Sequence, residues 1–263
     1  MGVFEALILG IVQGLTEFLP VSSSGHLVIV RNMLGVTEVP LFFDAMLHLG
    51  TLVAVVIVLF SEIAAMLRHP VKNHLGMLIL ATIPAGVIGI VFQDFFTEAF
   101  EGAVLGYCFL ATAGILVLSE FLAQRFANKH DVTMPGALSM GLMQALAIFP
   151  GISRSGSTIA GGLFTGINRE KAANFAFLMS IPVILASVLL TGKDAAEAGS
   201  MGEVSLPALI AGTAAAAVSG FLAVKFMLSL IKKKKLYGFA VYVAILGVYV
   251  LLDQQVFHLI FAA

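Results

Sequence analysis

The chain has 263 residues, of which 60% are hydrophobic and only 11% are charged, and its mean hydropathy is +1.05. A soluble domain of this length needs far more charge on its surface, so the composition excludes a soluble globular protein. The formal net charge of −1 says nothing about partners, because in a membrane protein the distribution of charge matters and the sum does not. We therefore expect an integral membrane protein surrounded by lipid, with no nucleic acid among its partners.

Two apolar regions near the starts of the two halves are interrupted in the middle. Residues 2–34 and 135–166 each contain a break of Pro, Gly and Ser that leaves arms too short to span a bilayer. An arm of about 11 residues covers about 16 Å, which is half the hydrocarbon thickness. We expect each region to form a re-entrant hairpin of two half-helices, with its irregular backbone buried in protein or lining a wet cavity.

The other apolar segments are uninterrupted. A spanning helix needs about 20 mostly apolar residues. The sequence predicts six such helices, over residues 42–61, 75–93, 103–123, 172–190, 206–231 and 237–257. The fold class is thus an all-α polytopic membrane protein with six transmembrane helices and two re-entrant hairpins.

The two interrupted regions are an internal repeat. With an offset of 131, residues 10–26 and 141–157 agree at seven of 17 positions. The identical pairs include Gln13/Gln144, Phe18/Phe149, Ser22/Ser153, Ser24/Ser155 and Gly25/Gly156. Three predicted spans separate the hairpins, so the second hairpin enters from the opposite face and the repeat has inverted topology. We expect one membrane domain, 1–263, built from repeats of about 1–130 and 131–263, with both hairpin tips in one cavity.

Charge placement gives an orientation. Ten of the 14 lysines and arginines lie in four loops, at 62–74, 124–134, 167–171 and 232–235. The loops on the other side contain acidic residues: Glu38, Asp94, Glu98, Glu101, Asp194, Glu197 and Glu203. The positive-inside rule places the basic loops in the cytoplasm and both termini outside.

Each break is followed by the start of a half-helix, at Ser22–Gly25 and at Ser153–Gly156. Free backbone N–H groups and the positive end of the helix dipole make such a start an anion site. Arg154 adds a fixed charge whose fork geometry suits phosphate. Two facing sites of this kind suit a polyanion of diphosphate size. Close helix packing by small residues would also explain the serines and glycines, but it would not explain an arginine at this depth.

The first hairpin also carries an acid, an amide and an imidazole. Gln13 and Glu17 share a face if their arm is helical. A carboxylate beside a phosphate site is repulsive unless it takes part in proton transfer or binds a divalent cation, so we predict Mg²⁺ or Ca²⁺ with Gln13 and Glu17 as ligands. His26 lies one turn beyond Ser22 and Ser23, where it can move a proton or attack phosphorus itself. A packing role is the alternative for His26.

The remaining polar residues of the apolar segments are weaker candidates. Asp44 and His48 lie one turn apart at the outer end of the first span, either in the same cavity or at the interface. Lys225 is expected to extend toward the inner face. Asn168 and Arg169 are expected to cap and anchor a helix.

Two motifs resemble those of a known family. The first is Gln13-x-x-x-Glu17 followed by Pro20-Val-Ser-Ser-Ser-Gly-His26, and the second is Pro150-Gly-Ile-Ser-Arg-Ser-Gly-Ser-Thr158. They resemble those of the undecaprenyl-diphosphate phosphatases, also called the bacitracin-resistance family, and the resemblance extends over essentially the whole chain. The first motif of that family opens with Glu or Gln, and this chain has Gln13.

The resemblance implies hydrolysis of a C55-type polyprenyl diphosphate to the monophosphate and inorganic phosphate, at the outer (periplasmic) face of the cytoplasmic membrane. This reaction recycles the carrier lipid of peptidoglycan synthesis. The resemblance also implies a divalent metal, bacitracin resistance on overproduction and a homodimer. Glu17, Ser23, His26 and Arg154 correspond to the catalytic residues of the family. With the repeat, the motifs give a predicted substrate-binding set of Ser22, Ser24, Gly25, Gln144, Ser153, Ser155, Gly156 and Thr158.

The predicted mechanism is in-line phosphoryl transfer. Ser23 attacks the terminal phosphorus, His26 and Glu17 handle the protons, and Arg154, the helix starts and a metal ion stabilise the charge. A phosphohistidine route through His26 uses the same atoms. The main alternative function is an inverted-repeat transporter or flippase for a lipid phosphate or small anion. Transport needs no nucleophile–base pair, and a purely structural scaffold would leave Arg154 and His26 unexplained.

Overall fold

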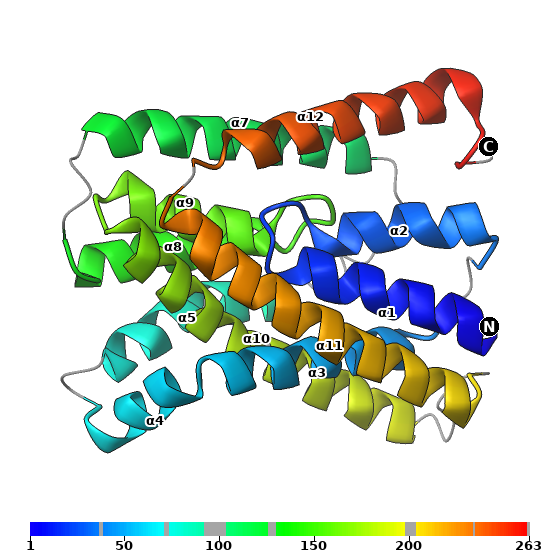
Figure 1. Ribbon diagram of the computed structural model, residues 1–263, viewed down its shortest axis with the longest axis horizontal. Coiled ribbons are helices and arrows are strands. Elements are labelled where there is room, and N and C mark those ends of the chain that lie inside the picture. The colour runs from blue at the N-terminus through cyan, green and yellow to red at the C-terminus, as the bar shows by residue number, and fades with distance from the viewer. Residues whose placement is uncertain are drawn as a thin grey trace.

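The computed structural model describes residues 1–36, 39–70, 74–91, 104–125, 130–197, 204–233 and 235–261. Regular structure in these ranges is entirely helical, as the sequence predicts (Figure 1). The helices are α1 (Val3–Glu17), α2 (Ser23–Leu34), α3 (Leu41–Val58), α4 (Phe60–Arg68), α5 (Leu75–Val91), α7 (Leu105–Arg125), α8 (Met134–Leu146), α9 (Arg154–Phe164), α10 (Arg169–Glu197), α11 (Leu206–Ile231) and α12 (Tyr237–Leu252), followed by a π-helical turn at Asp253–Phe257.

Five helices in the described part of the chain are long and apolar enough to cross a membrane. They are α3, α7, α10 up to Lys193, α11, and α12 continued to Phe257. Their surfaces carry many large exposed apolar side chains, such as Ile57 and Ile245, which a lipid environment accommodates. The molecule is therefore a multi-pass membrane protein. The sixth expected span, 75–93, coincides with α5, whose 17 residues fall short of a full span; residues 92 and 93 lie outside the described ranges.

The helix α10 (Arg169–Glu197) is longer than the span expected over 172–190, and the first expected span is interrupted near its end. The span predicted over 42–61 ends at Val58, and Leu59, with φ −100° and ψ 21°, separates it from α4. In α4, Met66 is buried while Glu62 and Arg68 are exposed, so this short helix is amphipathic. The sequence does not indicate this bend, because the residues around Leu59 are apolar and include no proline or glycine.

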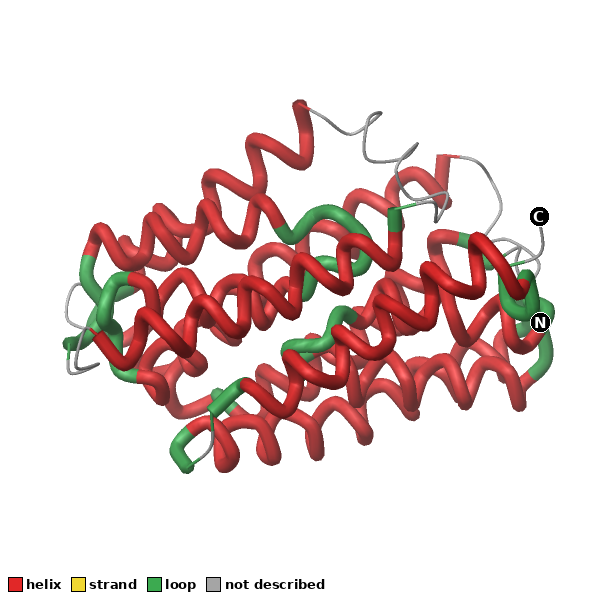
Figure 2. The backbone as a smooth tube through the Cα atoms, turned by 90° about the horizontal axis from the view of Figure 1, so that it is seen from above, coloured by secondary structure: helices red, strands yellow, loops and turns green. Residues whose placement is uncertain are grey.

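Helices α1 and α2, and helices α8 and α9, form two pairs that each fold back on themselves. They contain 15, 12, 13 and 11 residues, close to the arm length expected for half-helices. In Figure 1 the first pair occupies the right half of the molecule and the second pair the left half. Figure 2 shows loop segments in the middle of the molecule as well as at its ends. The two breaks lie in the interior, because Pro20 and Val21 of the first and Pro150 and Gly151 of the second are buried.

Helix α1 packs against α11 through small residues. A Cβ atom added at Gly14 would lie 2.0 Å from Ser219 Oγ, and one added at Gly10 would lie 2.2 Å from the carbonyl oxygen of Gly212. Small residues at such positions let helix backbones approach closely in membrane proteins. This contact fixes the first arm against a full-length span.

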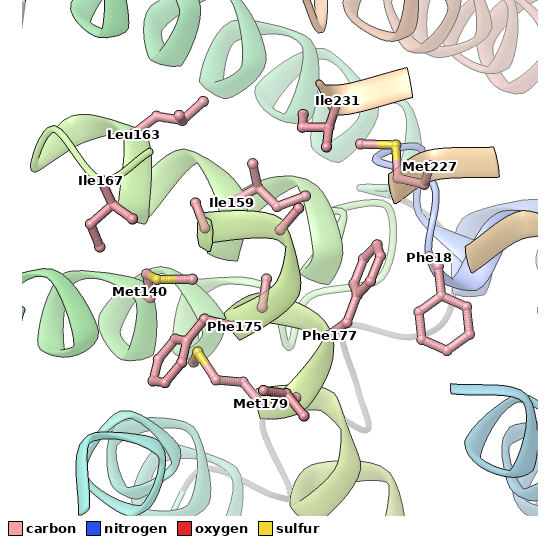
Figure 3. Close-up of a cluster of buried hydrophobic side chains, with 14 of the residues drawn as sticks. Phe18, Met140, Ile159, Leu163, Ile167, Phe175, Phe177, Met179, Met227 and Ile231 are labelled. Atoms are coloured by element: carbon pink, nitrogen blue, oxygen red, sulfur yellow. The ribbon is translucent and has the colours of Figure 1, made fainter. Parts of the chain in front are cut away.

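Both hairpins are also anchored on α10 through the largest apolar cluster (Figure 3). Phe18 directly follows Glu17, and its ring meets that of Phe177 on α10 edge to face, with 5.4 Å between centroids. Met140 of α8 and Ile159 of α9 belong to the same cluster. The cluster thus packs both hairpins against the same helix.

The basic segments gather at the end of the molecule opposite the termini (Figure 1). Lys171 pairs there with Asp131 at 2.6 Å, and Lys232 pairs with Glu170 at 2.7 Å. This separation agrees with the charge asymmetry in the sequence. Several residues used for that prediction lie outside the described ranges, namely Glu38, Lys72, Asp94, Glu98, Glu101, Lys129, Glu203 and Lys234.

Two of the weaker polar candidates are now placed. Asn168 caps α10 as expected, because its Oδ1 accepts from the N–H of Glu170 at 3.0 Å. Arg169 is more than a surface anchor, since both terminal guanidinium nitrogens donate to the fully buried carboxylate of Glu120 on α7. Lys225 places its Nζ 4.3 Å from the ring centroid of Phe221; its predicted extension toward the inner face stays a prediction.

Candidate active site

The first break turns at Ser22, whose φ of 69° and ψ of 99° are rare for an L-residue. Its Oγ accepts a hydrogen bond from the N–H of Gly25 at 3.4 Å and lies 3.4 Å from Ser24 Oγ. Ser22 thereby caps α2. A strained residue of this kind persists only where its surroundings hold it, and such residues cluster at functional sites.

The second break repeats this cap. Ser153 Oγ accepts from the N–H of Gly156 at 3.1 Å and lies 3.3 Å from Ser155 Oγ. Thr112 of α7 supports the turn, because its hydroxyl accepts from the N–H of Ser153 at 3.0 Å and donates to the carbonyl of Gly151 at 2.9 Å. Thr112 could not be identified from the sequence, because it is one polar residue in an apolar run.

The two breaks touch each other. Ser155 Oγ donates to the carbonyl of Leu19 at 2.8 Å. Arg154 forms an ion pair with Glu17 through its Nη2 and the Oε1 of the acid. Glu17 is only 4% exposed, and an unpaired carboxylate at such burial would be strongly destabilising. The structure therefore brings together the acid of the first half and the arginine of the second.

Glu17 is the common partner of the other polar side chains in this centre. Its Oε2 accepts from Ser23 Oγ at 2.5 Å and from Gln13 Nε2 at 2.9 Å. The same Gln13 nitrogen lies 2.9 Å from Nδ1 of His48. Because the amide nitrogen must face the carboxylate, His48 Nδ1 is the acceptor of that bond. His48 thus joins the polar centre, the first of the two locations considered for it.

Asp44, the residue paired with His48 in the sequence prediction, has another main partner. It forms an ion pair with Arg31 of α2, and the side chains are 23% and 15% exposed. The pair joins the end of α2 to the start of α3. The two charged side chains lie near the polar centre, but neither forms a hydrogen bond or ion pair with Glu17.

Four residues near the hairpin ends have buried polar atoms without a hydrogen-bond partner in the described structure. These atoms are Gln13 Oε1, Arg154 Nη1, both amide atoms of Gln144, and Ser157 Oγ. Leaving such an atom unsatisfied costs about 1–3 kcal/mol, and native structures rarely do so without a ligand or water. Arg154 Nη1 offers a donor to an anion, and Gln13 Oε1 offers an acceptor to a cation or donor.

The other predicted substrate-binding residues are near the same breaks. Thr158 Oγ1 donates within its own helix, toward the carbonyls of Arg154 and Ser155 at 2.8 and 3.1 Å. A Cβ atom at Gly156 would lie 3.1 Å from Pro20 Cβ, so glycine allows the two breaks to approach. These residues shape the junction between the hairpins.

His26 lies in α2 as predicted, but its ring nitrogens form hydrogen bonds with residues other than Ser23 and Glu17. Nδ1 is 2.7 Å from the carbonyl oxygen of Ser22, and Nε2 is 2.7 Å from the hydroxyl of Tyr242 on α12. The sequence did not single out Tyr242. The only indication in the sequence is general: a buried tyrosine in an apolar span usually has a hydrogen-bond partner for its hydroxyl.

The donor set limits how a metal ion could bind. Among the residues that the structure describes, no group of three or more His, Cys, Asp or Glu side chains lies close enough to hold one. Gln13 Oε1 is unpartnered and adjoins Glu17. Mg²⁺ is commonly held by one or two protein oxygens together with substrate phosphates and water. The residues fit a divalent cation in that substrate-assisted form.

Fold and site together define a polytopic helical membrane protein with a buried acid–serine–arginine centre where two broken helical regions meet. A family model described as bacitracin resistance protein BacA matches residues 6–249, and the chain belongs to this family. The resemblance seen in the two motifs is confirmed.

Curated relatives cover the chain almost completely. It is 47% identical to an undecaprenyl-diphosphatase of Carboxydothermus hydrogenoformans, over 97% of this chain and 98% of the relative. Undecaprenyl-diphosphatase 3 of Bacillus cereus is 42% identical over 97% and 98%. An undecaprenyl-diphosphatase of Halothermothrix orenii is 40% identical over 98% and 100%.

Proposed function

We propose that the protein hydrolyses undecaprenyl diphosphate to undecaprenyl phosphate and inorganic phosphate, and so recycles the carrier lipid of peptidoglycan synthesis. Its family and the names of its relatives support this activity. The observation that carries it is the hydrogen bond of Ser23 to Glu17 beside the unpartnered Nη1 of Arg154. A transporter or flippase is not favoured, because moving an anion needs no nucleophile bonded to a base.

Ser23 is the nucleophile in this proposal. Its Oγ attacks the terminal phosphorus and its proton passes to Glu17 Oε2, which already accepts that hydrogen at 2.5 Å. The bond to the bridging oxygen breaks, undecaprenyl phosphate leaves, and water then hydrolyses the phosphoserine. Phosphoryl transfer passes through a loose transition state, so a carboxylate held by an arginine is a sufficient base.

The charge on the transferred group is stabilised by Arg154 and by the two helix starts. Nη2 of Arg154 holds Glu17, and Nη1 is left to donate to a phosphate oxygen. Preorganised donors of this kind act strongly in a water-poor site. The predicted part of His26 in proton transfer stays a prediction, since its ring nitrogens bond to Ser22 and Tyr242.

A divalent cation, Mg²⁺ or Ca²⁺, is the proposed cofactor, with Gln13 Oε1 and Glu17 as its protein ligands. When bound, it neutralises charge on the diphosphate. The amide nitrogen of Gln13 donates to Glu17, so its Oε1 is beside the carboxylate and has no partner of its own. That orientation leaves the oxygen available to the cation.

Gln13 substitutions test this ligand assignment. Gln13→Ala is expected to raise the Mg²⁺ concentration for half-maximal phosphate release about tenfold, which corresponds to about 1.4 kcal/mol of lost binding free energy. Gln13→Glu is expected to lower it, because added ligand charge tightens such sites. Metal titrations of activity and of calorimetric binding measure both. Equal metal dependence in the three proteins would contradict the assignment.

The finer topology is also part of the proposal. Helices α1 and α2 would be one re-entrant hairpin and α8 and α9 the other, in repeats of about 1–130 and 131–263 with inverted topology. Contacts support this: α1 packs on α11 as α8 packs on α5, while α3 packs on α10 and α7 on α12. Helices α3 and α10, and likewise α7 and α12, hold corresponding places in the two halves, and the contact of α1 with α11 is the counterpart of that of α8 with α5, with α5 as the sixth span.

The proposed orientation puts the basic end in the cytoplasm and the active site open to the outer face of the cytoplasmic membrane. The positive-inside rule supports it. So does the partly exposed polar set of Arg31, Asp44 and His48. Arg31 lies in the last turn of α2, and α2 belongs to the half of the molecule that carries the termini in Figure 1. The homodimer implied by the resemblance stays a prediction.

The direct test of the proposed function is phosphate release from C55 or C15 prenyl diphosphates by detergent-purified protein, with and without EDTA. Wild-type release should stop with EDTA. Arg154→Ala is expected to lower kcat/KM by about 10³-fold, because it removes a preorganised donor to the transferred phosphoryl group. Arg154→Lys should recover only part of this, since lysine lacks the planar fork.

Arg68→Ala is the matched control, because Arg68 is exposed at the end of α4. It should keep wild-type release. Folded wild-type protein that releases no phosphate from any of these lipids, with Mg²⁺ or with Ca²⁺, would refute the hydrolase and return the interpretation to a transporter.

A further inference from the structure

The two hydrogen bonds of His26 fix its tautomer. The carbonyl oxygen of Ser22 can only accept, so Nδ1 of His26, at 2.7 Å, carries a hydrogen and donates it. In the neutral ring Nε2 is then an acceptor, and at 2.7 Å it receives the hydroxyl hydrogen of Tyr242. Both nitrogens are thus assigned by the chemistry of their partners.

The bond from Nδ1 acts on the most strained residue of the first break. The Ser22 carbonyl also receives the backbone N–H of His26, but at 3.3 Å, beyond the usual range for such a bond. The imidazole is therefore its closer partner. It restrains the peptide group between Ser22 and Ser23, next to the unusual backbone of Ser22, whose φ is 69°. Ser23 follows directly and donates to Glu17 at 2.5 Å, so the backbone of Ser22 sets the direction of the nucleophile.

Tyr242 holds the ring from the other side. Its ring stacks on that of His26, with 5.7 Å between centroids and 17° between planes, while Phe109 of α7 meets the same imidazole edge to face. His26 is 9% exposed and Tyr242 is 46% exposed. A tyrosine on the exposed side of α12 thus turns its hydroxyl inward to a buried histidine in α2.

We propose that Tyr242 is a positioning residue for the reaction: its hydroxyl fixes the His26 ring, which holds the Ser22 carbonyl and so presents Ser23 to Glu17. This inference rests on the proposed hydrolysis. It assigns α12, at the far end of the chain from the catalytic motif, a direct part in the geometry of the nucleophile. Tyr242 itself contacts neither Ser23 nor Glu17 and acts through His26.

Tyr242→Phe keeps the stacked ring and removes only the hydroxyl. It is expected to lower kcat about 10–100-fold, the range typical for loss of a partner that orients a reacting group through another residue. KM should stay within about twofold, because phosphate and lipid contacts are unchanged. Tyr249→Phe, on the same helix, is the control and should match wild type in both constants.

Histidine-selective ¹⁵N NMR gives a readout that is independent of turnover. The His26 signals, assigned by their loss in His26→Gln, should show protonated Nδ1 and unprotonated Nε2 in wild type and in Tyr249→Phe. In Tyr242→Phe, Nδ1 should stay protonated, because the Ser22 carbonyl still accepts its hydrogen, and the Nε2 signal alone should shift, because it has lost the hydroxyl that donates to it. Either a wild-type His26 protonated on Nε2 or a Tyr242→Phe enzyme with wild-type kcat would overturn the inference. If wild type and Tyr249→Phe both fail to release phosphate, the proposed function is refuted instead. The NMR signals then still test the hydrogen bond between His26 and Tyr242.

Discussion

Replacing Ser23 with alanine is expected to lower the rate of phosphate release at saturating substrate by on the order of 10⁴-fold or more. Losses of this size follow removal of a serine nucleophile, because the other catalytic residues contribute little to the rate once the nucleophile is absent. The substitution also leaves Glu17 with the two neighbours that hold it, Arg154 and Gln13. The protein should therefore remain folded, and the loss should appear in kcat and hardly in KM.

Thr16→Ala is the matched control for that experiment. Thr16 is next to Glu17, but its hydroxyl donates to the carbonyl of Val12 in its own helix at 2.6 Å, so its loss should change kcat less than about twofold. Mass spectrometry of rapidly quenched wild-type enzyme should detect phosphate on Ser23. If Ser23→Ala turned over normally while His26→Ala were inactive, the phosphohistidine route would replace the serine mechanism.

Much of the candidate site could be predicted because strong local signals identify it. Pro, Gly and Ser interrupt two apolar regions, and half-length arms force the irregular backbone into the interior. The odd number of spans between them predicts that Glu17 and Arg154 approach from opposite sides, although 136 residues separate them. The ion pair of these two residues agrees with that prediction.

The partners of single polar residues inside apolar spans could not be predicted in this way. Tyr242 lies in α12, which is apolar around its whole circumference, so periodicity does not indicate which side faces the protein. The same holds for Glu120 and Thr112 in α7. Their roles depend on how the helix is rotated, and that rotation is set by packing against helices far away in the sequence.

Glu120 is the clearest example, because it organises the basic end of the molecule. Its carboxylate is fully buried, takes both terminal nitrogens of Arg169, and accepts the N–H of Leu236 through Oε1 at 2.7 Å. One side chain of α7 therefore holds the start of α10 and the start of α12. The start of α12 in turn positions the helix that carries Tyr242.

Glu120→Ala is expected to reduce the free energy of unfolding by about 3–5 kcal/mol, because it leaves the Arg169 guanidinium partly buried without its counter-charge. Leu236 also loses the acceptor of its N–H. Unfolding in mixed detergent micelles, followed by circular dichroism, measures the change. The effect on phosphate release should be smaller than the effect on stability, since Glu120 does not contact the proposed site.

The exposed pair of Lys171 and Asp131 at the same end provides the control. Its side chains are 49% and 55% exposed, so Lys171→Ala should cost less than about 1 kcal/mol. The double substitution Glu120→Leu with Arg169→Leu should recover much of the loss seen in Glu120→Ala, because it removes both charges together. If Glu120→Ala cost no more than Lys171→Ala, the buried pair would not hold the helix starts, and the placement of α12 would have to come from its packing on α7 alone.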